Sequence, residues 1–372
     1  MKKLFYLLCA AAVLGLYACS GKDEVPDPDP TDDPTENPSN PSDPNNPNDP
    51  NNPNGGESET PDEMTLAFPD PIFRAYVLAN FDTDKDGKIS EAEALAVQRI
   101  NVGNEWNTPD SEKIQSLEGV QYFTNLTYLD CWYNRLTALD VSKNTALTTL
   151  YCDYNQLTAL DVSKNTALTR LSCVVNPLKT LDVSKNTALE YLYCNSNQLT
   201  ALDVSQNTAL TWLYCSDNQL TSLDVSQNTA LTVLWCVSNQ LTALDVTGAT
   251  ALEGLYCYSN RLTALNVTGA TALTRLDCSY NQLTALDVSQ NTALEWLWCV
   301  SNQLTELDLS KTNLVNSSSN KDSSSGYPLS CAPMPTLKTL YLKKGWSIKG
   351  ITDDWNRSND YIPDETEIVF VD

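Results

Sequence analysis

Residues 147–167 read Leu147-Thr-Thr-Leu150-Tyr-Cys152-Asp-Tyr-Asn155-Gln-Leu157-Thr-Ala-Leu160-Asp-Val162-Ser-Lys-Asn165-Thr-Ala167, and variants of this stretch follow one another along the middle of the chain. A fixed period of this length predicts a solenoid, because one unit cannot bury its apolar face alone and successive turns must stack. A cysteine recurs every 21 residues, and each is followed three residues later by an asparagine, from Asn134 to Asn302: Cys131, Cys152, Cys173, Cys194, Cys215, Cys236, Cys257, Cys278 and Cys299.

The first part of the unit, L-x-x-L-x-C-x-x-N-x-L, resembles the leucine-rich repeat, with cysteine where leucine is more usual. The resemblance implies that Leu150 and Cys152 point inward from a short strand, that parallel strands form a concave sheet, and that Asn155 satisfies backbone groups at a turn. The rest of the unit alternates apolar and polar residues and leaves no room for a long helix. We therefore expect a β-rich solenoid with a 21-residue period, similar to the internalin-type bacterial repeats.

Two residue types, cysteine and aspartate, recur at the same position in successive repeats and would form columns along the coil. The cysteines favour small buried thiols filling the core, because their Cβ vectors point the same way, whereas disulfides and metal sites fit this arrangement poorly. A second column has Asn266 at one position and aspartate at the others. Hydrogen bonds from nearby Ser or Thr are expected to offset the repulsion between these carboxylates, and loosely held cations are the alternative. These aspartates are Asp140, Asp161, Asp182, Asp203, Asp224, Asp245, Asp287 and Asp308.

The N-terminal residues resemble a bacterial lipoprotein signal. Lys2 and Lys3 precede an apolar stretch that ends in L-Y-A-C at Cys19, which would become the lipidated first residue of the mature chain. The acidic run Asp23-Glu24 resembles the surface-export signal of Bacteroidetes-type lipoproteins. We expect a chain anchored in the outer membrane through the lipid on Cys19 only, and exposed on the cell surface.

Residues 25–61 contain eleven prolines among Asp, Asn and Ser, a composition that predicts an extended stalk without a core. The net charge of the whole chain is −24. Residues 20–62 supply twelve acidic side chains and one lysine, so −11 of this charge belongs to the stalk. Such an acidic chain disfavours nucleic acid as a partner, since phosphates require Lys and Arg.

Residues 82–93, D-T-D-K-D-G-K-I-S-E-A-E, match the EF-hand loop at every defining position, with Gly87 at the sharp turn. A helix that begins at Asp70-Pro71 precedes the loop, and a second from Ser90 to about Ile100 follows it. The alternative is that Ser90 and Glu93 form only a capping box. We expect one structural calcium ion in an N-terminal cap. The candidate ligands are Asp82, Asp84, Asp86, the carbonyl of Lys88, Ser90 and Glu93.

Five segments follow from these patterns: a signal peptide (1–18), a lipidated stalk (19–62), a cap with the calcium loop (63–123), nine leucine-rich repeats (124–313) and a Ser-rich insertion with a C-terminal cap (314–372). Ile114, Leu117, Val120 and Phe123 are expected to form a partial repeat that joins the cap to the coil. Cys331 falls off the 21-residue period, which suggests a lone thiol.

Aromatic residues gather at the variable positions beside Leu and Cys, which strand alternation would turn outward over the sheet. They could pack only against cross-strand neighbours, but an exposed row this long exceeds what monomers usually tolerate. Arg170 and Arg275 lie on the same face. The rings are Tyr128, Trp132, Tyr133, Tyr151, Tyr154, Tyr191, Tyr193, Trp212, Tyr214, Trp235, Tyr256, Tyr258, Tyr280, Trp296 and Trp298.

Two functions stay open. The first is a protein-binding module that uses the aromatic concave face, and the second is a glycan-capturing lipoprotein of a polysaccharide-uptake system, since Tyr and Trp serve both. An enzyme is not expected. The chain contains no histidine, so a His-based triad or zinc-histidine site is excluded, and no glycine-rich phosphate loop is present.

Overall fold

The computed structural model describes residues 66–314, 329–331, 334–346 and 365–371. All of them belong to one compact unit, Met64–Asn320 with Tyr327–Asp372. The predicted signal peptide, Cys19, the stalk and the Ser-rich run at 317–325 lie outside the described residues. None of the helices in the described part is long and apolar enough to cross a membrane.

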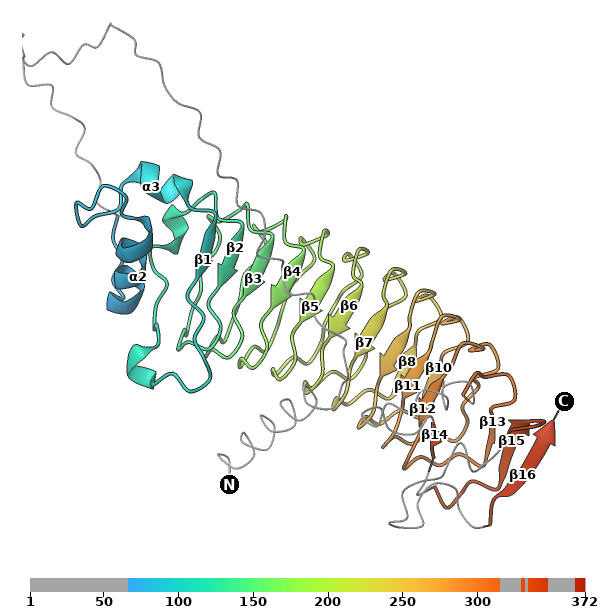
Figure 1. Cartoon of the computed structure of the whole chain (residues 1–372). Coiled ribbons are helices and arrows are strands. Elements are labelled where there is room, and N and C mark those ends of the chain that lie inside the picture. Colours follow the sequence, from blue (N-terminus) through green and yellow to red (C-terminus); the bar gives the residue numbers. More distant parts are fainter. Residues whose placement is uncertain (1–65, 315–328, 332–333, 347–364, 372) are drawn as a thin grey trace, which may run out of the picture. The chain divides into compact units, whose positions relative to one another are not determined.

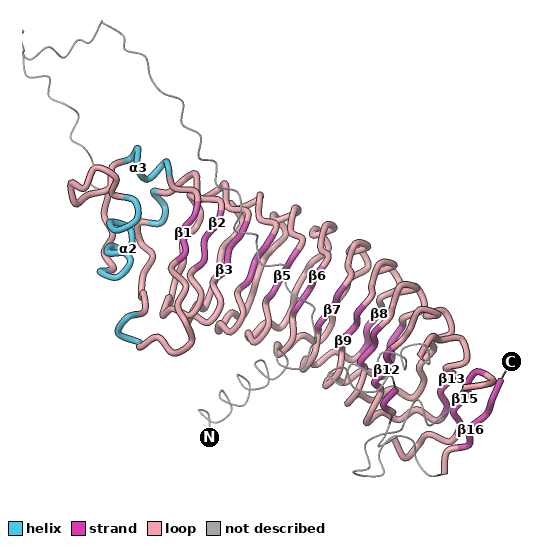
Figure 2. The backbone as a smooth tube through the Cα atoms, in the orientation of Figure 1, coloured by secondary structure: helices cyan, strands magenta, loops and turns pink. Residues whose placement is uncertain are grey.

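The main element is a parallel sheet of eleven strands that runs along stacked turns with little helix (Figures 1 and 2). Most of its strands have three residues, with the middle leucine buried, and successive strands pair in register, as Leu192 does with Leu213. Its strands, in order, are β1 (Arg99–Asn101), β2 (Tyr128–Asp130), β3 (Thr149–Tyr151), β4 (Arg170–Ser172), β5 (Tyr191–Tyr193), β6 (Trp212–Tyr214), β7 (Val233–Trp235), β9 (Gly254–Tyr256), β11 (Arg275–Asp277), β12 (Trp296–Trp298) and β14 (Leu329–Ser330).

The asparagine that follows each strand satisfies backbone groups at the turn, as predicted, and it also joins neighbouring turns. The Nδ2 of Asn218 donates to the carbonyl of Cys215 in its own turn (3.1 Å) and to that of Cys194 in the preceding turn (3.0 Å). Its Oδ1 accepts from the backbone N–H of Leu199, also in the preceding turn (3.0 Å). The same pattern recurs from Asn155 to Asn302. These buried bonds satisfy the backbone groups that the turn leaves unpaired.

The ten cysteines of the described residues are buried and form no disulfide, which confirms the prediction that the nine cysteines of the 21-residue period fill the core. Burial raises the pKa of each, for example to about 12 for Cys194. Some also donate weakly to a backbone carbonyl of the next turn, as Cys152 Sγ does to Ser172 (3.3 Å). The cysteines therefore pack in the core as small apolar side chains do.

A second asparagine column, whose role the sequence analysis did not identify, lies on the opposite side of the coil. Asn186 is fully buried, and its Nδ2 donates to the carbonyls of Val162 and Asn165 in the preceding turn (3.0 and 2.8 Å). Ala249 and Ala270 replace asparagine in two turns. Those turns carry two additional short strands that pair with each other, β8 (Ala243–Asp245) and β10 (Ala264–Asn266).

Glycine permits a close backbone approach at these two turns. A Cβ on Gly269 would lie 2.1 Å from the carbonyl oxygen of Thr247, and one on Gly248 would lie 2.6 Å from that of Ser226. Only glycine allows the backbones to approach this closely. The T-G-A-T variant of the repeat lets the turns approach closely on the side opposite the long sheet, where β8 and β10 pair.

The N-terminal cap consists of α2 (Pro71–Phe81) and α3 (Glu91–Ala96), with short 3-10 turns at Asp110–Glu112 and Val120–Tyr122. The Asp70 carboxylate caps α2 through Oδ1, and its Oδ2 accepts from the N–H groups of Gln115 and Ser116. Ile114 and Phe123 are buried, and Ile114 N–H donates to Asn134 as a repeat leucine would. This confirms the predicted partial repeat.

The second cap helix is shorter than predicted. It ends at Ala96, and residues 99–101 form the first strand of the long sheet instead of its last turn. Ile100 and Val102 alternate inward as Leu and Cys do in a repeat, and Ile100 pairs with Leu129. By pairing with β2, residues 99–101 cover an otherwise open edge of the long sheet. The stabilisation from this pairing outweighs their local helix propensity.

Cys331 is not a lone thiol outside the repeat. β14 pairs with β12, so that Leu329 lies beside Leu297, and the Cys299 N–H donates to the Ser330 carbonyl (2.8 Å). Cys331 therefore continues the cysteine column, although 32 residues, not 21, separate it from Cys299. A further sheet of β13 (Glu306–Asp308), β15 (Thr339–Lys343) and β16 (Glu367–Val371) ends the described coil.

Replacing Asn218 by alanine should destabilise the chain by about 2 to 4 kcal/mol, because several buried backbone groups lose their partner at about 1–3 kcal/mol each. The exposed neighbour Gln219 provides the matched control as Gln219→Ala, which should change little. Urea unfolding followed by circular dichroism measures both, and equal losses would contradict the role assigned to the asparagine.

Candidate functional site

We call the outward surface of the eleven-stranded sheet the sheet face. In leucine-rich repeats this is the concave side. Three side-chain positions per turn contribute to it, as in β6: Trp212 before the buried Leu213, Tyr214 between Leu213 and buried Cys215, and Ser216 after the cysteine. The inward position of leucine and cysteine thus sets which residues face outward, because strand side chains alternate.

The structure places the predicted rings outside the core. Trp132 and Tyr280 are 36% and 59% exposed, and the other predicted rings are half-buried against one another. Tyr133, Tyr154 and Tyr280 differ from the prediction in one respect, because they lie on the turn after the strand, at φ of 51–56°. This left-handed conformation, unusual for tyrosine, lets the following asparagine enter the coil.

The middle of the sheet face carries a continuous row of rings. Trp212 and Tyr214 are nearly parallel (8° between planes, centroids 6.0 Å apart), and Tyr214 stacks on Trp235 of the next strand (25°, 5.3 Å). Trp235 lies 4.3 Å from Tyr256, centroid to centroid. Toward the N-terminus, Tyr193 contacts Tyr214, and Tyr191 contacts Trp212. We call these six residues the central ring row.

Further rings flank the central ring row. Trp296 and Trp298 lie on one strand, with centroids 5.4 Å apart. Tyr258 is half-buried, and desolvation raises its pKa to about 12. Of the two predicted arginines, Arg170 lies over the ring of Tyr191 (5.0 Å to the centroid), and Arg275 is exposed on β11. The sheet face thus combines an aromatic centre with a few cations.

Near the N-terminal cap, the rings are accompanied by acidic residues that the sequence analysis did not identify. Asp130 and Asp153 take outward positions on neighbouring turns. Burial raises the pKa of both, that of Asp153 to about 6. Their only sequence signal is an aspartate at positions where most other repeats place Tyr, Trp, Ser, Asn or Val, and a single chain gives no way to distinguish that from ordinary variation.

The aspartate column from Asp140 to Asp308 is held by hydrogen bonds to the backbone, as expected. Asp203 Oδ1 accepts from the Ser205 N–H (2.9 Å), and the equivalent bond occurs in each turn. In the turn where asparagine replaces aspartate, Asn266 Oδ1 accepts it from the Thr268 N–H. These bonds lower the pKa of Asp203 and most of its counterparts. The column is therefore explained by tight turns on the side opposite the sheet face.

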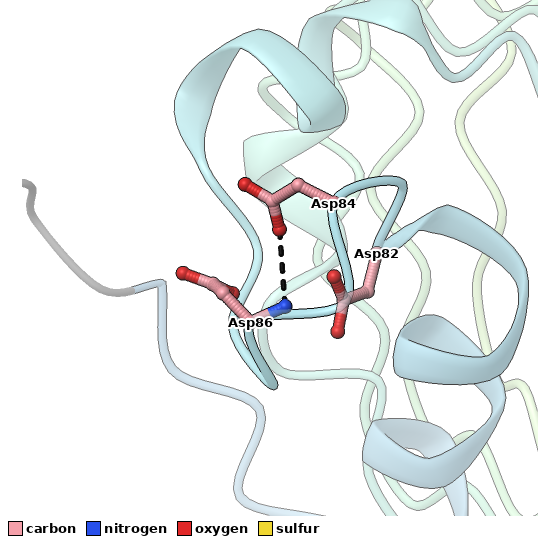
Figure 3. A group of neighbouring side chains, drawn as sticks. All are labelled: Asp82, Asp84 and Asp86. Atoms are coloured by element: carbon pink, nitrogen blue, oxygen red, sulfur yellow. Dashed lines mark hydrogen bonds between the residues drawn. The ribbon is translucent and has the colours of Figure 1, made fainter.

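The predicted calcium loop brings three carboxylates together. One oxygen from each of Asp82, Asp84 and Asp86 lies within 4.8 Å of the others (Figure 3). The loop is held by bonds from Gly87 N–H to Asp82 Oδ2 (2.9 Å) and from Asp86 N–H to Asp84 Oδ1 (3.1 Å). Gly87 has a φ of 83°, as its predicted turn requires. The trio is exposed and could hold a cation.

Glu93 is not part of this trio. Its Oε1 accepts from the N–H and hydroxyl of Thr83, and its Oε2 from those of Ser90. These bonds lower its pKa to about 2. Ser90 and Glu93 do form a capping box on α3. The ligand roles of Lys88, Ser90 and Glu93 stay predictions.

Known proteins show the same architecture. The family described as Leucine Rich repeats (2 copies) matches residues 124–165. The solved functional domain of InlJ from Listeria monocytogenes, described as including a cysteine ladder, is 36% identical with a TM-score of 0.55, and the match covers 74% of this chain and 69% of that one. This chain belongs to the leucine-rich repeat proteins related to the internalins.

Two other comparisons agree. Internalin J of Listeria monocytogenes serotype 4b (strain F2365) is 43% identical over 78 residues, which are 21% of this chain but only 8% of that protein. An internalin, InlF, of the same strain is 20% identical with a TM-score of 0.54 over 85% of this chain and 95% of that one, and so shares the fold. Internalin-like proteins are non-enzymatic and generally bind proteins through such surfaces, in agreement with the expectation that the chain is not an enzyme.

Proposed function

We propose that this internalin-related protein is a binding module that captures a protein ligand on its sheet face, and that the central ring row is the main contact. The supporting observation is the row itself, six Tyr and Trp side chains in mutual contact on the outer face of a sheet. Buried neighbours do not require rings there, since Ser, Thr and Val take the same positions in other turns. Tyr and Trp are the residues that most often anchor protein partners.

The ring geometry favours protein over glycan. Sugars stack on an open ring face, whereas the ring of Tyr214 is stacked with the rings of both Trp212 and Trp235. These rings therefore stack on one another, and their hydroxyl and indole N–H groups would suit the polar groups of a polypeptide surface. Capture of a glycan for polysaccharide uptake is the alternative function, and the more exposed Trp132 and Tyr280 would be its stacking platforms.

The proposed place of action is the cell surface. The L-Y-A-C sequence and the acidic run after it support lipid attachment at Cys19 and export across the outer membrane. The proline-rich stalk would then hold the binding face away from the bilayer, with no other contact to the membrane.

Replacing both Trp212 and Trp235 by alanine should weaken capture of a protein ligand at least tenfold, because two central anchors are lost. The immobilised full chain would be incubated with biotinylated host surface proteins, and a glycan array would be run in parallel. Trp106→Ala, in an exposed cap loop, is the matched control and should capture as wild type does. Unchanged capture by the double variant, or binding to glycans alone, would contradict the proposal.

We further propose that the aspartate trio holds a structural calcium ion. The fit rests on three oxygens within 4.8 Å and on Asp82 Oδ1, a buried atom without a hydrogen-bond partner among the described residues. Calcium takes oxygen ligands of this kind, and Asp82, Asp84 and Asp86 would supply carboxylates, with the Lys88 carbonyl, Ser90 and Glu93 as further ligands. The ion would link the end of α2 to the start of α3.

Removing calcium with EGTA should accelerate proteolysis near Asp82 while the repeats stay protected, since the ion would stiffen the cap and not the coil. Limited proteolysis with mass spectrometry measures both regions. Asp84→Asn with Asp86→Asn should mimic chelation, whereas Asp161→Asn with Asp182→Asn, on the repeats, should not. A cap that is cleaved equally with and without calcium would refute the ion's role.

A further inference from the structure

Five residues near the N-terminal end of the sheet face form what we call the acidic-aromatic cluster: Trp132, Tyr133, Tyr154, Asp130 and Asp153. The three rings contact one another, with centroids 5.6 to 6.3 Å apart and planes inclined by 53° to 76°. The indole of Trp132 lies on the backbone of Gly103, where an added Cβ would be 2.1 Å from Cδ1 of the ring. The same Cβ would be 3.0 Å from Asp130 Oδ1, so indole and carboxylate are neighbours.

Hydrogen bonds hold the carboxylates of Asp130 and Asp153 in place but do not fully offset the free-energy cost of burying them. Asp153 Oδ1 accepts from the Ser172 hydroxyl and from the Val174 N–H (2.6 Å), so that both of these bonds reach the same oxygen. Asp130 accepts from the Trp132 N–H (3.1 Å) and the Tyr128 hydroxyl (3.3 Å). Burial raises the pKa of both groups, and each also raises the pKa of Cys131, which places both near that thiol.

The chain's own cations form no ion pair with these carboxylates among the described residues. Among the residues that the structure describes, the ion pairs join Asp110 to Lys113 and to Arg135, and neither involves Asp130 or Asp153. Arg99 lies over the ring of Tyr128, 3.5 Å from its centroid, and lowers the pKa of Asp130 less than burial raises it. A positive group from outside would therefore meet two carboxylates in a partly desolvated setting, where charge pairing is strong.

The same surface already shows how it holds cations. Lys113 Nζ lies 4.3 Å from the centroid of Tyr133, within the cluster, and the Arg99–Tyr128 contact is next to it. Ring faces attract ammonium and guanidinium groups, and the attraction increases when the cation loses its water. Trp132, 36% exposed, offers the largest such ring in the cluster.

We propose that the acidic-aromatic cluster receives a basic side chain, lysine or arginine, of the protein ligand, with its charge between Asp130 and Asp153 and its stem along Trp132 and Tyr154. This rests on the proposed function and adds the chemistry of one contact to it. A metal ion fits less well, because hard cations take six to eight oxygens and the cluster offers two carboxylates among rings.

The test uses the full chain, labelled with nitrogen-15 at its tryptophan indoles, and titrates it with Nα-acetyl-arginine N-methylamide and its lysine equivalent. The Trp132 indole resonance, assigned through Trp132→Phe, should shift with both probes and stay in place with the neutral norleucine equivalent. The shift should be lost in Asp130→Asn with Asp153→Asn. Asp277→Asn is the matched control and should retain it, since Asp277 takes the position of Asp130 seven repeats (147 residues) further along and is itself buried.

A Trp132 resonance that does not respond to either cation, that responds equally to norleucine, or that still responds in the double aspartate variant would overturn the proposal. Circular dichroism of that variant shows whether it is folded, and the wild-type comparison of cationic with neutral probes does not depend on it. Failure here would leave capture through Trp212 and Trp235 untouched. Conversely, a shifting resonance without protein capture would refute the proposed function alone.

Discussion

The hydrogen bonds of the buried asparagines are the constraint on which the rest of the structure depends. Each side chain bonds to carbonyl groups 3 and 24 residues earlier and to an N–H group 19 residues earlier, as Asn218 does with Cys215, Cys194 and Leu199. These separations are compatible with one another only when each turn has 21 residues. The asparagines therefore fix the register of the coil, and the leucines and cysteines then occupy its interior at identical depths.

A fixed register also separates structural from variable positions. Because Leu and Cys point inward in every turn, the residues beside them are presented at regular spacing on one face, whatever their identity. That regularity lets rings on successive strands meet, as Tyr214 and Trp235 do, and places carboxylates of neighbouring turns, Asp130 and Asp153, on the same face. The proposed recognition surface is thus carried by side chains that contribute little to the coil.

The period, the inward Leu and Cys, the free thiols and the outward rings could be predicted from the sequence because each depends on a pattern repeated many times. Features that occur once were harder to predict. The length of α3 depended on strand pairing by Ile100 with a partner 29 residues away. Cys331 continues its column because β14 pairs with β12, although 32 residues, not 21, separate it from Cys299.

The candidate site divides in the same way. The aromatic positions and the aspartate trio were found from spacing and motif, but the mutual stacking of the rings depends on side-chain conformations. The acidic-aromatic cluster depends on contacts between turns that no local pattern records. The left-handed turn at Tyr133 and Tyr154, which positions two of its rings, follows from the demands of the asparagine that comes next and not from the tyrosines themselves.

Hydroxyl-radical footprinting of the native full chain, read residue by residue by mass spectrometry, tests most directly whether thiols lie inside and rings outside. Thiols are intrinsically the more easily oxidised groups, so their protection is informative. The structure predicts that Trp132, Trp235 and Trp298 are oxidised in the folded chain while the cysteine column reacts only after denaturation. Thiols modified as fast as the rings in the folded chain, or rings modified only after unfolding, would contradict it.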